Sequence, residues 1–251
     1  MTDTVAQQLP LNSEAWQKTL HWQPYETQQG LFQGLYQGVL DGNRQANLTR
    51  ITEPSGFWEK HLWDSLSGLA PWYEPEKPEW LPTVKTVIDI GTGGGFPGLP
   101  VAIAKPQWHI TLLDSTRKKI AFLETLCGQL ELTNTAFLAE RAETAGRAPM
   151  HRAQYDLAMV RAVGPASTCA EYALPLLKKS GYAVLFRGQW TDDEEDLFMG
   201  ALDTLGGELV AICPWETPLT QGIRHCLYVK KIEKTDKEFP RQVGVPAKYP
   251  L

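Results

Sequence analysis

The sequence predicts an α/β protein with a mostly parallel sheet covered by helices on both faces and a small helical N-terminal extension. Two observations favour this class. From Val84 onward, short β-branched runs alternate with helical stretches, the pattern of parallel strands joined by crossover helices. Before Val84 the spacing is helical, with no convincing strand. The chain has 251 residues, 43% of them hydrophobic, which is enough to build a buried core.

Residues 1–82 are predicted to form the helical extension and a linker. Leu31, Leu35 and Val39 fall at i, i+4 and i+8, on one face of a helix that we expect to end at Asp41–Asn43. Residues 57–69 have a similar apolar face and predict a second helix. Four prolines follow by residue 82, which excludes helix and central strand and predicts a linker.

Residues 83–235 are predicted to form the core, with about seven strands. The expected strands are Thr86–Ile90, His109–Asp114, Thr135–Leu138, Asp156–Val160, Tyr182–Arg187, Leu209–Ile212 and His225–Ile232. The main expected helices are Arg117–Gln129, Ala166–Lys179 and Asp193–Leu205. The segment 213–224 is too irregular for a crossover helix, so the last strand is expected to be antiparallel. Residues 236–251 are predicted to form a basic, proline-rich tail.

Composition excludes several functional classes. The four cysteines lie far apart without a CxxC pair, so neither a metal site nor a disulfide framework is expected, and a reducing cytoplasm fits best. No apolar run approaches the ~20 residues of a membrane span. The net charge of −5 excludes a uniformly basic surface but permits a local basic face. The sequence does not determine the oligomeric state, and a monomer is expected.

The clearest local signal is the glycine-rich loop after the first strand. Five glycines lie within residues 91–98, directly before a helical stretch. Glycines allow a tight turn and let a ligand lie against bare backbone. In an open α/β sheet, ligands bind at the carboxyl ends of the strands, where this loop falls. The loop therefore predicts a cofactor site.

Two cofactor classes compete for this loop. Gly93–Gly98 formally satisfies GxGxxG, the dinucleotide fingerprint, and Asp114 after the next strand suits a ribose in either class. Asp89, however, lies two residues before Gly91 and gives D-x-G-x-G-x-G, which resembles the first motif of S-adenosylmethionine methyltransferases. That cofactor has no phosphate and carries a cationic sulfonium, which carboxylates suit. The sequence favours a Rossmann-like class I methyltransferase; a nicotinamide enzyme and a structural turn remain alternatives.

Seven segments, spread along nearly the whole chain, form a series of motifs: Asn47–Thr49, His61–Leu66, Asp89–Gly98, Leu112–Ser115, Arg141–Glu143, Arg161–Val163 and the ending Phe239–Leu251. This series resembles one family, the bacterial 16S ribosomal RNA guanine-N7 methyltransferases, or glucose-inhibited division protein B family. Arg187 departs from the family, where a lysine is expected, and a guanidinium is not equivalent to an ammonium. The resemblance implies that Gly91, Phe96, Ala142, Glu143 and Arg161 line the site of S-adenosylmethionine.

The expected cofactor residues all lie near the carboxyl edge of the sheet. They are Asp89, Gly91, Gly93, Phe96, Asp114, Ser115, Thr116, Ala142, Glu143 and Arg161. Alternatives stay open for several of them. Asp114 could cap the next helix, Glu143 could be a surface acid, and Asp89 could bond loop amides. Arg161 could face the cofactor or RNA, or form a structural ion pair.

Guanine N7 has a free in-plane lone pair and needs no proton removed before it attacks a methyl group. No catalytic residue in the strict sense is therefore expected, and alignment of the reactants is sufficient. Arg161, which stays protonated, is expected to position them.

RNA binding must be local, given the negative net charge. Residues 217–251 carry seven basic and three acidic side chains, and Arg117–Lys119 forms a second basic cluster. Such side chains contact phosphates without reading sequence. The expected RNA contacts are Arg117, Lys118, Lys119, Arg187, Arg224, Arg241 and Lys248. The expected partner is ribosomal RNA or the small subunit. A methyltransferase of another substrate, a non-catalytic RNA-binding protein of the same fold and a solvated charged tail remain alternatives.

Overall fold

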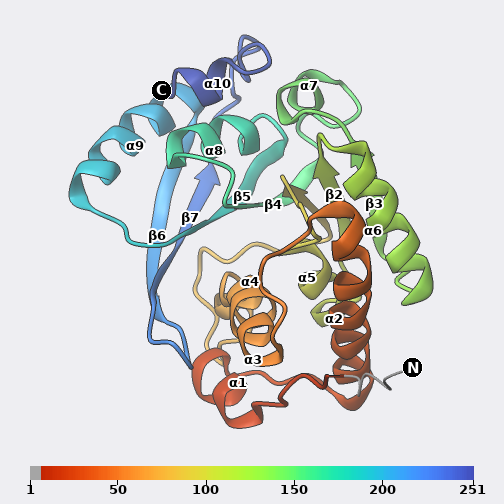
Figure 1. The fold of residues 1–251 in the computed structure, drawn as a ribbon. Helices are drawn as coiled ribbons and strands as arrows, with labels where there is room; N and C mark the ends of the chain where they lie inside the picture. Colours follow the sequence, from red (N-terminus) through yellow and green to blue (C-terminus); the bar gives the residue numbers. More distant parts are fainter. Residues whose placement is uncertain (1–6) are drawn as a thin grey trace.

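A computed structural model describes residues 7–251; the first six residues of the expected extension lie outside the described residues. Seven strands form one sheet in the order β3-β2-β1-β4-β5-β7-β6 (Figure 1). The strands are β1 (Thr86–Ile90), β2 (His109–Asp114), β3 (Thr135–Ala139), β4 (Tyr155–Arg161), β5 (Leu177–Arg187), β6 (Gly207–Glu216) and β7 (Ile223–Lys231). Neighbours from β3 to β5 pair in parallel, and β7 is antiparallel to both β5 and β6. The predicted fold class is therefore confirmed.

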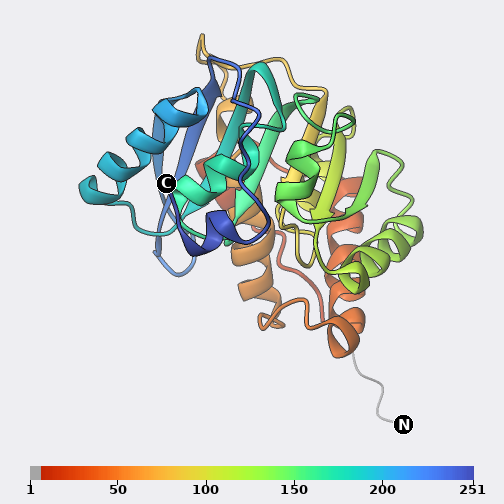
Figure 2. The same ribbon diagram turned by 90° about the horizontal axis from the view of Figure 1, so that it is seen from above.

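Helices cover both faces of the sheet (Figure 2). The strand residues alternate between two hydrophobic clusters: Val87 of β1 belongs to one, and Ile88 to the other. The first cluster includes residues of α5 (Gly98–Ala104) and α6 (Arg117–Gln129). The second cluster includes residues of the remaining core helices. The C-terminal segment, residues 239–251, joins this cluster through Phe239. These helices are α7 (Ala142–Arg147), α8 (Ala166–Ala173) and α9 (Asp192–Leu205), and α10 (Val245–Lys248) lies in the C-terminal segment.

The N-terminal extension packs on the same face as α5 and α6. Its elements are α1 (Ser13–Leu20), α2 (Glu26–Ala46), α3 (Pro54–Phe57), the π-helical η1 (Trp58–Trp63), α4 (Asp64–Ser67) and the 3₁₀ turn η2 (Ala70–Trp72). Trp16, Trp58 and Trp63 are fully buried there and join the first cluster. The extension and the core therefore share one apolar interior. Within residues 7–251, no helix is long and apolar enough to cross a membrane.

Several elements differ from the prediction in their boundaries or were not predicted. The helix expected over 166–179 ends at Ala173, because Pro175 cannot continue it, and β5 begins at Leu177. The helix expected to stop at Asp41–Asn43 continues to Ala46 and ends where Asn47 adopts a left-handed conformation. The short helix α1 was not predicted.

Glycines set the distance between α2 and α6. A glycine occupies every fourth position along this side of α2: Gly34, Gly38 and Gly42. A Cβ atom on Gly38 would lie 2.3 Å from Leu126 of α6, and one on Gly42 would lie 2.0 Å from Phe122. The missing side chains let the two helices approach closely, which explains why a helix interior tolerates these glycines.

Gly38→Val is expected to destabilise the protein by about 1–3 kcal/mol, because two methyl groups would be forced against Leu126. Denaturant unfolding measures this change. Gly30→Ala on the same helix is the matched control: nothing lies within 4 Å of its Cβ position, so it should stabilise by up to about 1 kcal/mol. Equal unfolding midpoints for Gly38→Val and the unaltered protein would contradict close helix packing.

Candidate functional site

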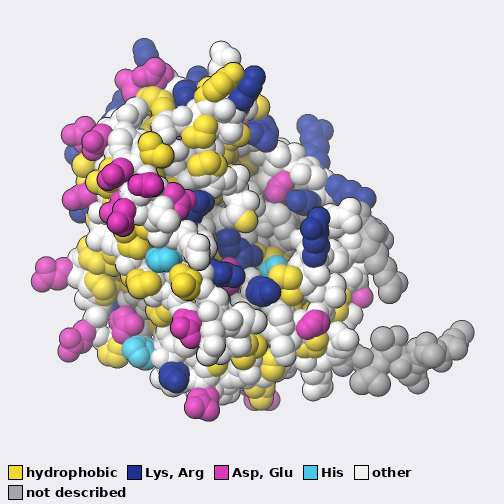
Figure 3. All heavy atoms as spheres, turned by 60° about the vertical axis from the view of Figure 1, so that its left-hand side comes forward, with side chains coloured by type: hydrophobic (Ala, Val, Ile, Leu, Met, Phe, Trp, Pro, Cys, Tyr) yellow, Lys and Arg dark blue, Asp and Glu magenta, His cyan; other side chains and the backbone are white. Residues whose placement is uncertain are grey.

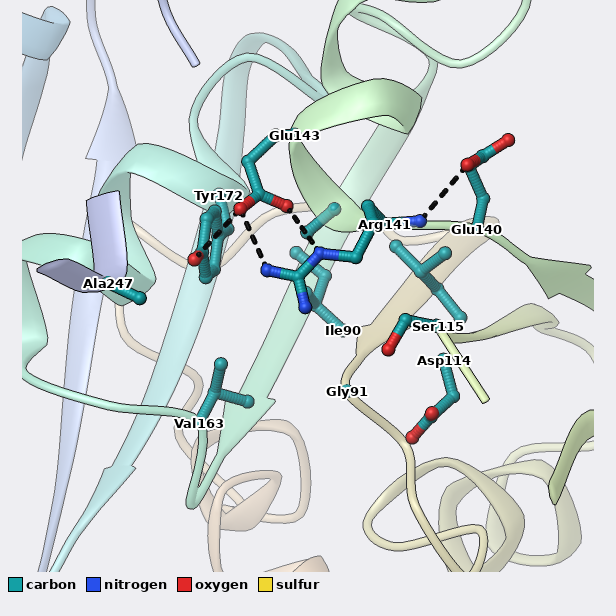
Figure 4. A pocket seen from close by; sticks show the side chains of 12 residues that line it. Ile90, Gly91, Asp114, Ser115, Glu140, Arg141, Glu143, Val163, Tyr172 and Ala247 are labelled. Carbon is teal, nitrogen blue, oxygen red and sulfur yellow. Dashed lines mark hydrogen bonds and ion pairs between the residues drawn. The ribbon is translucent and has the colours of Figure 1, made fainter. Parts of the chain in front are cut away.

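A cavity of about 230 Å³ lies at the carboxyl ends of β1, β2, β3 and β4 (Figure 4). Its walls come from the loop after each of these strands, from α7 and α8, and from the C-terminal segment. The lining residues are Ile90, Gly91, Leu113, Asp114, Ser115, Glu140, Arg141, Ala142, Glu143, Val163, Tyr172 and Ala247. Three carboxylates and one guanidinium are among them, so the cavity suits a ligand with positive charge.

The glycine-rich loop is held by its backbone conformation and by Asp89. Gly91 has a φ of 73°, and a Cβ atom there would lie 2.7 Å from Val163. Asp89 is fully buried, and its Oδ2 accepts hydrogen bonds from the Thr92 hydroxyl (2.6 Å) and the Gly98 amide (2.8 Å). Burial raises the pKa of Asp89 to about 6. Asp89 therefore bonds the glycine-rich loop, which is the alternative to a cofactor contact, and it does not line the cavity.

Asp114 faces the cavity at the end of β2. Its Oδ2 accepts the Gly93 amide at 3.0 Å, and its Oδ1 accepts the Thr116 amide at 2.8 Å. The N-cap residue of α6 is Thr116, so Asp114 is not the cap. A carboxylate has about four acceptor positions, and two remain for ligand hydroxyls. Asp114 is therefore suited to a ribose.

Glu143 is a buried carboxylate that several groups hydrogen-bond, and it is not an exposed surface acid. Its side chain is 1% exposed and accepts two hydrogen bonds from the Arg141 guanidinium, at 2.9 and 3.2 Å. The Gly244 amide donates a third bond at 2.9 Å. Burial favours the neutral carboxyl, but these donors outweigh it and lower the pKa of Glu143 below its usual range. The carboxylate is consequently charged and fixed in place.

A second cavity, of about 450 Å³, opens beside the first. Its lining residues are Lys60, His61, Asp64, Arg161, Ala162, Phe186, Arg187, Gly188 and Arg224. Four of these residues are Lys or Arg and one is acidic, so the cavity attracts anions. Figure 3 shows Lys and Arg side chains gathered about a hollow on one face of the molecule.

Asp64 of α4 organises this basic cavity. Its Oδ2 accepts a hydrogen bond from Arg161 at 2.7 Å, and its Oδ1 lies 3.4 Å from the Nε of Arg224. The Asp64 and Arg161 side chains are 13% and 14% exposed, and Arg161 also donates to the Lys60 carbonyl. The ion pair considered for Arg161 is present, and the same arginine faces a cavity.

His61 joins the extension to the glycine-rich loop. Its ring stacks on Phe96, with centroids 4.3 Å apart, and its Nε2 lies 2.7 Å from the Thr49 hydroxyl. Burial and the positive charge of Arg161 lower the pKa of His61 to about 3. His61 is therefore neutral near pH 7. It lies on the π-helical turn η1, a geometry common at functional sites.

The two cavities meet at the end of β4. Arg161 and Ala162 line the basic cavity, and Val163 lines the cavity of Asp114. Ala162 has a φ of 57°, a left-handed conformation that costs non-glycine residues about 1 kcal/mol or more. The strained residue marks the point where the chain passes from one cavity to the other.

Five of the ten predicted cofactor residues line the first cavity: Gly91, Asp114, Ser115, Ala142 and Glu143. Gly93 and Thr116 hold Asp114, Phe96 stacks on His61, and Arg161 lines the basic cavity. The prediction missed the other seven lining residues of the first cavity, which are Ile90, Leu113, Glu140, Arg141, Val163, Tyr172 and Ala247. Five of these seven lie within the motifs that carry the family resemblance. Only the three-dimensional fold shows that their side chains meet, because they come from separate elements of the chain.

The predicted RNA contacts fall in three places. Arg187 and Arg224 line the basic cavity, and Arg117, Lys118 and Lys119 lie at the start of α6. Arg187 also donates to the Gly164 carbonyl and lies 3.4 Å from Glu194. In the C-terminal segment, Arg241 pairs with buried Glu171, and Lys248 is exposed.

Comparison with known proteins agrees with this geometry. Residues 28–215 match the model of the family GidB, described as rRNA small subunit methyltransferase G. The chain belongs to the GidB family. A relative named ribosomal RNA small subunit methyltransferase G, from Trichormus variabilis, is 56% identical over 97% of this chain and 98% of its own length. One of the same name from Trichodesmium erythraeum is 49% identical over the whole chain and 98% of its own length.

Among solved structures, the cofactor-bound protein Rv0187 from MTB resembles this GidB-family chain in fold. Its TM-score is 0.53 at 16% identity, over 79% of this chain and 90% of that protein. The similarity supports the class I arrangement of the sheet. The N-terminal extension brings His61 and Asp64 to the edge of this sheet.

Buried His61 is expected to make the stability of this GidB-family protein fall in acid. An unperturbed histidine titrates near 6.5 and folded His61 near 3, so between these values only the unfolded state binds the proton. The stability that neutral His61 confers is complete above pH 6.5 and is lost as the pH falls. In His61→Gln the loss between about pH 6.5 and 4 should be smaller by about 2–3 kcal/mol.

Denaturant unfolding of both proteins across this pH range tests the prediction. The buried Asp89 carboxyl changes stability with pH in the opposite direction, since its raised pKa favours the folded state in acid. Both proteins contain Asp89, so its contribution cancels when their stabilities are subtracted. Parallel stability curves would show that His61 takes up a proton in the folded state.

Proposed function

We propose that this chain is an S-adenosylmethionine-dependent enzyme that methylates N7 of a guanine in 16S ribosomal RNA. The observation that carries the proposal is the pair of cavities meeting at the end of β4. One is lined by carboxylates and the other by Lys and Arg side chains. The names of its GidB-family relatives support small-subunit ribosomal RNA as the substrate.

The first cavity fits S-adenosylmethionine by its chemistry. That cofactor, when bound, supplies a methyl group on a cationic sulfonium. Asp114 presents acceptor positions suited to the ribose hydroxyls, and the bare backbone of Gly91 leaves room against the loop. A pyrophosphate would instead meet three carboxylates here, which argues against the dinucleotide alternative.

The basic cavity suits a nucleotide flipped out of the RNA. Lys60, Arg187 and Arg224 can contact its phosphates, and Arg161 lies next to Phe96 of the cofactor loop, 5.8 Å from the ring centroid. No group needs to remove a proton from N7. The role of Arg161 and His61 is therefore to align the base rather than to accept a proton from it.

Charges outside the cavities support a local RNA surface beside α6. Arg117 and Lys118 are exposed two and three positions after Ser115, which lines the cofactor cavity. In the basic stretch 217–251, by contrast, the Lys231 ammonium at the end of β7 is buried and donates to the Leu174 and Leu177 carbonyls. Part of the basic excess there is thus used within the fold. We further propose that the protein acts as a monomer in the cytoplasm, where its RNA substrate resides.

Arg161→Ala is expected to lower N7 methylation by about a hundredfold or more, because a misplaced base loses alignment with the methyl group. Arg161→Lys should recover part of the rate, since it keeps the charge but not the planar fork. The measurement is mass spectrometry of 7-methylguanine in 16S RNA or small subunits incubated with each variant and labelled S-adenosylmethionine.

Asp64→Asn is the matched control, because it breaks the same ion pair and leaves Arg161 in the cavity. Thermal melting of all three variants separates alignment from stability. If Asp64→Asn and Arg161→Ala melt early and lose activity equally, Arg161 is only a structural partner. If the unaltered protein binds S-adenosylmethionine but forms no 7-methylguanine in the RNA, the proposed reaction is wrong.

RNA affinity is expected to fall steeply with salt, because phosphate contacts release counterions. Lys118→Glu should weaken RNA binding and flatten the salt dependence while cofactor affinity stays unchanged. Lys18→Glu on α1 is the matched control, since it makes the same charge change at an exposed site away from both cavities. Filter binding at several salt concentrations tests this, and equal effects of the two variants would place the RNA elsewhere.

A further inference from the structure

The C-terminal segment 239–251 is fixed to the core by several directed contacts. Arg241 donates to both carboxylate oxygens of Glu171, at 2.7–3.1 Å, and Glu171 is fully buried. Arg147 and Arg152 of the core donate to the Pro240 and Phe239 carbonyls, at 2.8 and 2.7 Å. Breaking such a buried pair is strongly unfavourable, so the segment stays docked.

Beyond Arg241 the chain turns toward the cofactor cavity. The Thr168 hydroxyl donates to the Pro246 carbonyl at 2.9 Å, and Ala247 is one of the lining residues. In Figure 4, Ala247 lies on one side of the cavity, and Asp114 and Ser115 lie on the other. The segment therefore contributes a wall that none of the four strands provides.

The same segment reaches a charged lining residue through its backbone. The Gly244 amide donates to Glu143 Oε1, and the same carboxylate holds the Arg141 guanidinium. Gly244 has a φ of 86°, a conformation that favours glycine and aims this N–H at Glu143. The Tyr172 hydroxyl, 3.4 Å away, donates to the same oxygen. The position of Arg141 in the cavity thus depends on a residue about a hundred positions later in the chain.

We propose that residues 244–247 are part of the S-adenosylmethionine site: Gly244 positions Glu143 and Arg141, and Ala247 forms the wall opposite Asp114. Glu143 and Gly244 act on the cofactor through other groups, so they are positioning residues. This proposal rests on the part of the proposed function that places S-adenosylmethionine in the first cavity. It does not depend on which base is methylated, so a wrong RNA substrate would leave it intact.

Calorimetric titration with S-adenosylmethionine tests the proposal without RNA or turnover. Ala247 is exposed to solvent at the cavity edge, so Ala247→Trp should leave the melting temperature unchanged. Its affinity for the cofactor should fall by about tenfold or more, because an indole would take up ligand space. Val243→Trp is the matched control, since Val243 is 56% exposed and does not line the cavity; it should bind normally.

A chain shortened after Arg241 provides a second, independent measurement. It keeps the side-chain pair with Glu171 but lacks both Gly244 and Ala247. It should unfold cooperatively and bind S-adenosylmethionine at least about tenfold more weakly. Unaltered affinity in either this chain or Ala247→Trp would overturn the proposal, as would equal weakening in Val243→Trp. If the shortened chain does not fold, the two tryptophan variants decide alone.

Discussion

The ion pair between Asp64 and Arg161 joins the two parts of the molecule on which the site depends. Asp64 belongs to the N-terminal extension and Arg161 to the end of a core strand, and both side chains are largely shielded from water. A partly buried charge of either sign would be costly alone, so each residue requires the other. The stacking of His61 on Phe96 supports the same junction. The extension is consequently a component of the active face rather than an appendage.

Buried carboxylates join the C-terminal segment to the core in a similar way. Glu143 and Glu171 are both fully buried, and each is neutralised by an arginine and a backbone amide. For Glu143 these donors reverse the effect of burial on the pKa, so the charge persists inside the fold. Charged hydrogen bonds are directional, and they fix the C-terminal segment more sharply than apolar contact would. The core therefore holds the C-terminal segment, like the N-terminal extension, by pairs of buried or partly buried charges.

The sequence predicted the sheet well because its signal is local. Each strand from β1 to β7 is an apolar run beside turn or helix residues, and the parallel arrangement follows from the alternation. Asp114 and the glycine-rich loop were identified for the same reason, since a strand end places them at one edge. Contacts between distant residues were not predictable in this way. Arg241 was expected to contact RNA, because nothing near it in sequence indicates Glu171, seventy positions earlier. Asp89 was expected in the cofactor site, and its burial against the loop became evident only in three dimensions.

The docked C-terminal segment has a consequence for the order in which the molecule can assemble. Ala247 forms a wall of the cavity of Asp114, and it follows every strand of the sheet in the chain. The core strands and the extension contact one another through earlier residues, so they can pack before this segment docks. The scaffold can therefore form first, and the ligand cavity is complete only when Ala247 is in place.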